Sequence, residues 1–163
     1  MIFATVGTQL PFDRLIETLD IWSLRHCKKN VFAQIGKEGA VPRHLDFAPT
    51  MTMSQFDRAV AKCSVVVAHA GMGSVLTALK ARKPLIIMPR RASYGEHRND
   101  HQLATAHQLR RLPGIQVAMD EAELVRQLNA PPSAANGGSI SPFASDRLIG
   151  AIQSFIHGGG VAA

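Results

Sequence analysis

Long apolar runs, aromatic residues and cysteines are all scarce in this chain of 163 residues. No stretch approaches the roughly 18 uninterrupted apolar residues that a membrane span requires, so we expect no membrane-spanning helix. One Trp and one Tyr do not supply the aromatic surface on which single-stranded nucleic acids stack, so no nucleic-acid partner is expected. Cys27 and Cys63 are isolated thiols, which indicates a reducing compartment and neither a disulfide framework nor a zinc site.

Acidic residues are also in short supply. Eighteen Lys and Arg against 12 Asp and Glu give a formal net charge of +6. This charge predicts an anionic partner, which on charge alone could be a nucleic acid, an acidic membrane surface or a phosphorylated small molecule. The arginines and histidines are concentrated between positions 90 and 111. A solvated basic face is the alternative interpretation of this region.

The start of the chain, MIFATVGTQL, begins inside a predicted strand. It lacks the basic, long apolar and small-residue regions of a secretion signal, so we expect a cytoplasmic protein. The length allows one domain with a hydrophobic core.

Short apolar runs alternate with segments of helical period, which predicts an α/β domain: a Rossmann-like parallel sheet with helices on both faces. Residues 65–68, VVVA, are apolar on both faces of a strand, as is typical of a central parallel strand. Ser54 and Asp120 are expected to be helix N-caps. Strands are expected at residues 2–6, 31–35, 45–48, 65–68 and 85–88 and around Val117.

The domain is expected to span residues 1–129. Residues 130–142, APPSAANGGSISP, are turn formers and small residues, which predicts a flexible loop. Residues 143–157 have apolar side chains at helical spacing, which predicts a C-terminal helix that packs on the domain or on a partner subunit.

The turn HAGMGS, residues 69–74, follows the predicted central strand and opens a helix. In open parallel sheets, ligands bind beyond the carboxyl ends of the strands, where helix N-termini present free N–H groups. Gly71 and Gly73 allow the backbone to approach a ligand closely, and with Met72 and Ser74 they suit a phosphate oxygen. We predict an anion cradle, with a tight strand-to-helix turn as the alternative. The dinucleotide GxGxxG motif and the Walker loop both fail to match.

The segment EHRNDHQ, residues 96–102, is dense in hydrogen-bond donors and acceptors. In a loop held by a rigid sheet, such a density favours ligand binding. His97 and His101 are four residues apart, but Arg98 replaces the Glu of the HExxH zinc motif, so no metal site is predicted.

HAGMGSVLTALKARKPLIIMPR followed by EHRNDHQLATA resembles the nucleotide-sugar-binding C-terminal domain of glycosyltransferase family 28, over roughly residues 1–128. ATVGTQLPFDRLI resembles the start of its stand-alone, single-domain members. Those members are the cytosolic subunit of the two-part dolichol-linked N-acetylglucosamine transferase and the PssE-like bacterial subunits of exopolysaccharide assembly. The sequence of the EHRNDHQLATA segment is most similar to that of the bacterial group. The resemblance implies the fold of the C-terminal half of a GT-B glycosyltransferase.

The resemblance further implies the donor-binding subunit of a two-part transferase. The donor would be a UDP-sugar, either UDP-N-acetylglucosamine or a UDP-hexose or UDP-hexuronic acid, and the acceptor a lipid-linked saccharide. A membrane-anchored acceptor-binding subunit would recruit the chain to the inner face of the membrane, and neither a cofactor nor a metal is expected. A non-catalytic nucleotide-sugar-binding or regulatory module is the alternative.

Roles of individual residues follow from the resemblance by position. Residues 69–74 would cradle the diphosphate, and Arg90 or Arg98 would stabilise the leaving-group charge. His69 is the candidate base, which the partner subunit could equally supply. Gly7 and Thr8 would lie near the phosphates of the donor. The sugar and the ribose would be held by residues 96–102, which include Glu96, His97, Arg98, Asn99, Asp100, His101 and Gln102.

Two positions depart from the pattern of the family. Thr77 stands where many relatives have an acidic residue for the ribose, and Thr105 stands where Asn is common. The mode of ribose recognition and the identity of the sugar are therefore left open by the sequence.

Overall fold

A computed structural model of the protein describes residues 1–26 and 30–132. Within them, one sheet contains β1 (Ile2–Thr5), β2 (Val31–Gln34), β3 (Asp46–Ala48), β4 (Val65–His69), β5 (Leu85–Met88) and β6 (Ile115–Val117). The helices are α1 (Asp13–Arg25), α2 (Met53–Lys62), α3 (Met72–Lys80), α4 (His101–Leu109) and α5 (Glu121–Asn129), with a short 3₁₀ turn, η1 (Ala92–Tyr94). The predicted C-terminal helix lies outside the described residues and stays a prediction.

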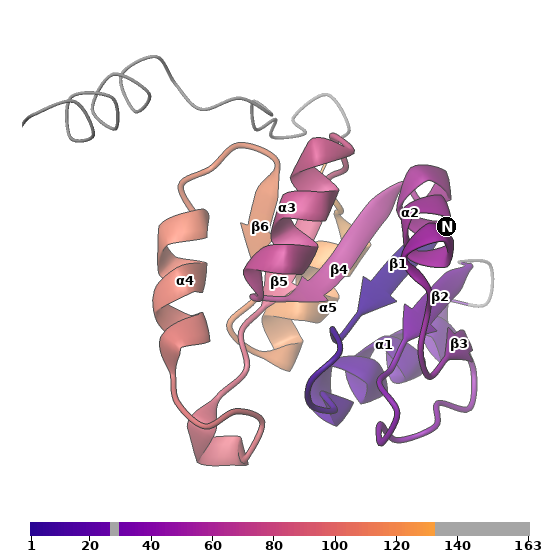
Figure 1. Ribbon diagram of the computed structural model, residues 1–163, viewed down its shortest axis with the longest axis horizontal. Helices are drawn as coiled ribbons and strands as arrows, with labels where there is room; N and C mark the ends of the chain where they lie inside the picture. Colours follow the sequence, from indigo (N-terminus) through magenta and orange to yellow (C-terminus); the bar gives the residue numbers. More distant parts are fainter. Residues whose placement is uncertain (27–29, 133–163) are drawn as a thin grey trace, which may run out of the picture.

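The sheet is parallel throughout and has the strand order β3-β2-β1-β4-β5-β6 (Figure 1). The chain first builds outward from β1 to β3 and then returns to add β4, β5 and β6 on the other side of β1. The strand order therefore reverses between β1 and β4, where Thr5 pairs with Ala68. Such a switch point leaves a crevice at the carboxyl ends of the two strands.

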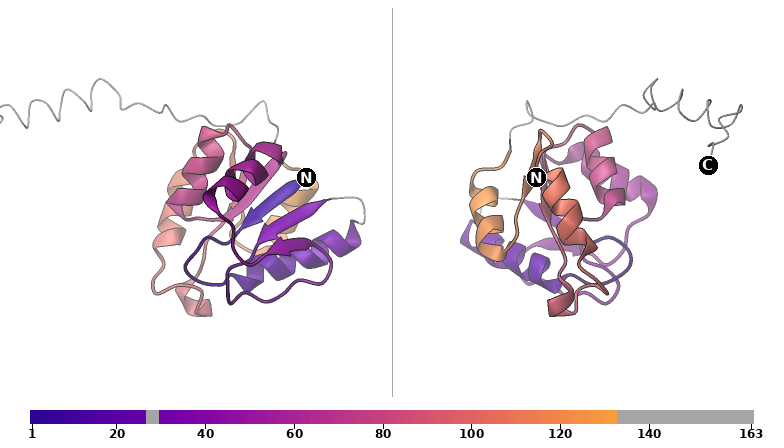
Figure 2. Two further views of the ribbon diagram at one scale, coloured as in Figure 1. Left: turned by 45° about the vertical axis from the view of Figure 1, so that its right-hand side comes forward. Right: turned by 90° about the vertical axis from the view of Figure 1, so that its left-hand side faces the viewer.

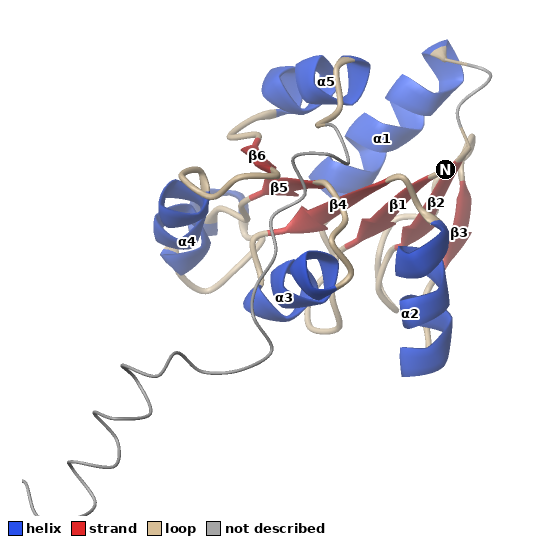
Figure 3. Ribbon diagram, turned by 90° about the horizontal axis from the view of Figure 1, so that it is seen from above, coloured by secondary structure: helices blue, strands red, loops and turns tan. Residues whose placement is uncertain are grey.

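Helices cover both faces of the sheet, α1 and α5 on one face and α2, α3 and α4 on the other (Figure 3). The alternation of side chains along each strand supplies both cores. In β4, Val67 faces the α1 and α5 layer, whereas Val66 and Ala68 face the α2, α3 and α4 layer. The Rossmann-like fold class predicted from the sequence is thereby confirmed. The loops after β1 and β5 come together at one end of the sheet (Figure 2).

Helix boundaries agree with the sequence at α5 and differ at α2. Asp120 caps α5 as predicted, because its Oδ1 accepts a hydrogen bond from the Glu123 amide at 2.7 Å. The prediction of Ser54 as an N-cap is wrong: the N-cap of α2 is Thr52, which forms a capping box with Gln55. Ser54 lies inside the first turn. None of the helices in the described part of the chain is both long and apolar enough to cross a bilayer.

Candidate functional site

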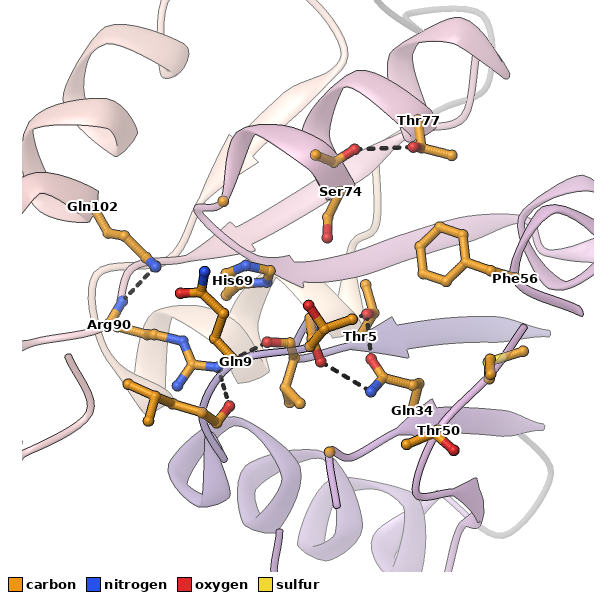
Figure 4. A pocket seen from close by; sticks show the side chains of 18 of the residues that line it. Thr5, Gln9, Gln34, Thr50, Phe56, His69, Ser74, Thr77, Arg90 and Gln102 are labelled. Atoms are coloured by element: carbon orange, nitrogen blue, oxygen red, sulfur yellow. Dashed lines mark hydrogen bonds between the residues drawn. The ribbon is translucent and has the colours of Figure 1, made fainter. Parts of the chain in front are cut away.

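A cleft of about 720 Å³ opens beyond the carboxyl ends of β1, β2 and β4 (Figure 4). It lies beside the switch point of the sheet, where the topology predicts a ligand site. The predicted site residues that line it are Gly7, Thr8, His69, Gly71, Gly73, Ser74, Arg90, His97, His101 and Gln102.

The imidazole of His69 lies between two glycines of different loops. A Cβ built on Gly71 would lie 2.1 Å from His69 Nε2, and one built on Gly7 would lie 2.7 Å from His69 Cε1. Gly7 also has a φ of +78°, which side chains rarely tolerate. Gly73, in contrast, has open space where a Cβ would be. The first glycine of HAGMGS is therefore required by the preceding histidine.

His69 is held as a neutral ring. Burial, and after it the charge of Arg90, lowers the pKa of His69 to about 4. The backbone of Thr5 opposes this shift only in part, and Nδ1 of the ring is buried. A general base works best when its pKa lies near the operating pH, so the predicted role of His69 as base is disfavoured. A neutral imidazole in the wall of the cleft remains able to hydrogen-bond a ligand.

Helix α3 presents its N-terminus to the cleft. It begins at Met72, and its N-cap, Gly71, makes no side-chain capping bond, which leaves first-turn amides available. Gly73 and Ser74 line the cleft. Met72, also predicted to contact the ligand, is not among the lining residues and is 48% exposed. Thr77, one turn further, lines the cleft and donates its hydroxyl to the Gly73 carbonyl at 2.9 Å.

The polar floor of the cleft is a feature that the sequence analysis missed. Gln34 Oε1 accepts a hydrogen bond from Thr5 Oγ1 at 2.7 Å, and Gln34 Nε2 donates to the carbonyls of Gly7 (3.0 Å) and Pro49 (3.3 Å). The Gly7 amide donates to Thr5 Oγ1 at 3.2 Å. This network fixes the loop after β1 to the loop before α2. The available signal was a glutamine at the end of the otherwise apolar strand VFAQ.

An apolar end of the cleft was also missed. Met51, Met53 and Phe56 line it, and the Phe56 ring packs edge-on against Phe3 with centroids 5.3 Å apart. Figure 4 shows Phe56 at the end of the cleft opposite Gln102. The exposed cation of Lys37 belongs to the same lining.

The prediction that Arg90 offers its guanidinium to a diphosphate does not fit the structure. Arg90 is 2% exposed, and its terminal nitrogens donate to four backbone carbonyls, those of Val6, Leu10, Pro11 and Glu96. Although Arg90 borders the cleft, its hydrogen bonds hold the chain itself. The guanidinium also packs on the Phe12 ring, 4.8 Å from its centroid.

Glu96 likewise does not have the predicted role of holding the sugar or ribose. Its carboxylate binds Arg14 through two hydrogen bonds, at 2.6 Å to Nε and 2.8 Å to Nη2. It also accepts a hydrogen bond from the Arg91 amide at 2.8 Å. Glu96 does not line the cleft. The loop position was predicted correctly, but the side chain is used to attach the loop to α1.

The histidines and the glutamine of EHRNDHQ do reach the cleft. The rings of His97 and His101 pack edge to face with centroids 4.5 Å apart. Burial, and after it the neighbouring charge of His101, lowers the pKa of His97. Gln102 is 3% exposed, and its Oε1 accepts a hydrogen bond from the Arg90 amide at 3.2 Å.

The three residues between these histidines lie outside the lining. Arg98, Asn99 and Asp100 were predicted to contact the substrate, and none borders the cleft. Asn99 Oδ1 accepts from His101 instead, and Asp100 Oδ1 accepts from the Ala92 amide at 2.8 Å. Both side chains thus organise the loop and the start of α4.

The charged side chains that line the cleft are cationic. Among the described lining residues there is no Asp or Glu, whereas Lys37 and Arg90 are present. In the described ranges, no three His, Cys, Asp or Glu side chains gather in a way that could hold a metal ion. Cationic side chains together with a helix N-terminus favour an anionic ligand.

The sequence profile of the glycosyltransferase family 28 C-terminal domain matches residues 1–131. The chain belongs to this family. A search of proteins with curated descriptions finds no match for the family 28 chain.

Solved structures of glycosyltransferases share the fold of this family 28 domain. MurG from Acinetobacter baumannii superposes with a TM-score of 0.63 at 17% identity, covering 94% of this chain and 49% of MurG. A solution structure of ALG13 superposes with a TM-score of 0.56 at 17% identity and covers 93% of each chain. For the glycosyltransferase of kitacinnamycin, the TM-score is 0.55 at 19% identity, over 82% of this chain and 36% of that one. The family 28 chain thus spans less than half of MurG and of the kitacinnamycin enzyme.

Proposed function

We propose that the cleft binds the nucleoside diphosphate of a sugar donor and that the chain is the donor-binding subunit of a glycosyltransferase. The observation that carries this proposal is the character of the cleft: open amides of the α3 N-terminus and a cationic lining without carboxylates among the described residues. A diphosphate needs N–H donors and positive charge at close range. Family membership supports the same assignment.

The two ends of the cleft suit the two other parts of a nucleotide sugar. Met51, Met53 and Phe56 provide an apolar surface for a nucleobase. The amide of Gln102 and the imidazoles at the opposite end can hydrogen-bond sugar hydroxyls. We take the donor to be a UDP-sugar, with UDP-N-acetylglucosamine or a UDP-hexose or UDP-hexuronic acid as the candidates.

A second polypeptide would complete the active site. The chain corresponds in extent to 93% of ALG13 but to only 49% of MurG, and His69, the candidate base in its own cleft, has a pKa of about 4. An acceptor-binding subunit that is anchored in the membrane would supply the lipid-linked saccharide and the base, as expected in exopolysaccharide assembly. The chain would then work in the cytoplasm at the inner face of the membrane.

The mechanism that we propose stabilises the leaving diphosphate by the chain's own groups. Amides of the first turn of α3 and the ammonium of Lys37 would bind its oxygens, and the buried charge of Arg90 would add a favourable potential. In this mechanism no cofactor or metal ion is required.

Calorimetric titration of the chain with UDP, UDP-sugars, GDP-sugars and dTDP-sugars tests the binding step. We expect UDP and one UDP-sugar to bind, and failure of every nucleoside diphosphate to bind would refute the proposal. Adding a candidate membrane subunit and a lipid-linked acceptor then tests transfer. The alternative, a binding or regulatory module without catalysis, predicts UDP-sugar binding with no turnover in that second assay.

A further inference from the structure

Arg90 joins two loops that border the cleft: the β1–α1 loop, residues 6–12, and the β5–α4 loop, residues 89–100. Its Nη2 donates to the carbonyls of Val6 at 2.7 Å and Leu10 at 2.6 Å, both in the β1–α1 loop (Figure 4). Its Nη1 donates to the carbonyl of Pro11 in the same loop and to the carbonyl of Glu96 in the β5–α4 loop at 3.2 Å. One side chain therefore ties both loops together.

These bonds occupy the part of the guanidinium that would otherwise bind a phosphate. A guanidinium has five N–H donors, four of them on the terminal nitrogens. A forked contact with phosphate uses a pair of these donors, so Arg90 would have to release a loop carbonyl in order to form one. The geometry therefore favours a role for Arg90 in shaping the cleft, and not in contacting the ligand.

The charge of Arg90 adds to this role. Glu96 gives its carboxylate to Arg14 and only its backbone carbonyl to Arg90. Burial lowers the pKa of Arg90 to about 10, so the guanidinium is still charged at neutral pH. A fixed positive charge behind the cleft wall attracts an anion without touching it.

We propose that Arg90 is a positioning residue that holds the β1–α1 loop against the end of β5, so that residues 7–9 face the ligand. The part of this inference that concerns the ligand rests on the proposed function. The part that concerns the loop does not, and it can be tested without any ligand.

Arg90→Lys and Arg91→Lys form a matched pair of variants. Lysine keeps the charge but replaces a planar fork by a single nitrogen, which cannot reproduce four directed bonds to two loops. Arg91 also donates to a backbone carbonyl, that of Met119 at 2.6 Å, but it does not line the cleft. Both variants therefore lose an arginine, and only one of them loses the tie between the loops.

Amide hydrogen exchange of the ligand-free proteins tests the loop. The amides of Val6 and Gly7 are hydrogen-bonded to Gln34 and Thr5, and their exchange should accelerate by roughly tenfold or more in Arg90→Lys, with little change in Arg91→Lys. The dissociation constant for UDP should rise by roughly tenfold in Arg90→Lys only, because an unfixed loop must be ordered on binding.

The outcomes separate the two proposals. Unchanged exchange in Arg90→Lys overturns the positioning role, and weaker UDP binding with unchanged exchange would instead show a direct contact with the diphosphate. If the wild-type protein binds no nucleoside diphosphate, the proposed function fails, and the exchange rates still decide whether Arg90 orders the loop.

A measurement on the wild-type protein covers the case in which Arg90→Lys does not fold. Through-hydrogen-bond couplings from the Arg90 Nη nitrogens to the Val6 and Leu10 carbonyls can be recorded by NMR before and after UDP is added. Couplings that persist in the complex support the positioning role. Their loss, with new coupling to phosphorus, contradicts it.

Discussion

His69 and Gly71 share one space: the imidazole occupies the volume where a side chain on Gly71 would begin, 2.1 Å from Nε2. Gly73, two residues on, has nothing within 4 Å of the same position. The two glycines of HAGMGS, equivalent in the sequence pattern, therefore have different reasons to be glycine.

Substitution by alanine should separate these two glycines. Gly71→Ala forces His69 out of its place and should cost about 1–3 kcal/mol of unfolding free energy, as overpacking does. Gly73 lies in helix α3 with open space beside it, so Gly73→Ala should raise the unfolding free energy by about 0.4–1 kcal/mol. Urea unfolding measures both values. Equal effects of the two substitutions would show that the ring of His69 does not fill this space.

The stability of the protein should depend on pH through His69. Its folded pKa is about 4, below the value of 6.5 for a free side chain, so the unfolded state binds the proton more tightly. This contribution is complete above pH 6.5 and is lost as the pH falls towards 4, at a cost of about 3 kcal/mol. The unfolding free energy of the wild type should therefore decrease as the pH is lowered from 6.5 to 4.

Two histidine variants show whether His69 causes this pH dependence of the unfolding free energy. His69→Gln should flatten the decline in unfolding free energy between pH 6.5 and 4, whereas His107→Gln, on the exposed side of α4, should leave it in place. A decline that survives in His69→Gln would mean that other groups carry it.

Removing Glu96 should destabilise the protein. The side chains of Arg14 and Glu96 are only 12% and 10% exposed. Glu96→Ala removes both hydrogen bonds between the carboxylate and the nearly buried guanidinium, which keeps the Pro89 carbonyl and a looser ion pair with Glu121 at 3.8 Å, and should cost about 3 kcal/mol. Arg126→Ala is the control, because the Arg126–Glu123 pair is largely exposed and should contribute below about 1 kcal/mol. Thermal and urea unfolding measure both effects, and a cost for Glu96→Ala as small as the control's would contradict the structural role.

The sheet was predictable because burial leaves a plain pattern in the sequence. Residues 65–68 are apolar on both faces since β4 lies between β1 and β5 and under helices on both sides. The glycine turn was predictable because strand, turn and helix follow one another there. The orientation of the Arg90 and Glu96 side chains was not predictable, because the sequence of a loop does not show whether a charged side chain binds a ligand or another loop. Gln34 and Phe56 lie far from the motifs and join the cleft only through the fold.

Lys37 is the exposed cation of the cleft, and its contribution to ligand binding should depend on salt. Lys37→Met should weaken UDP binding by roughly fivefold at low ionic strength, which corresponds to about 1 kcal/mol for an exposed charge pair. At 1 M salt, where the screening length is about 3 Å, the difference should nearly vanish. Lys62→Met, on the exposed side of α2 and outside the lining, should bind UDP like the wild type at both salt concentrations. Titrations at the two salt concentrations therefore distinguish a charge contact from a packing contact. If the loss of affinity in Lys37→Met persists at 1 M salt, the methylenes of Lys37, and not its ammonium, contact the nucleotide.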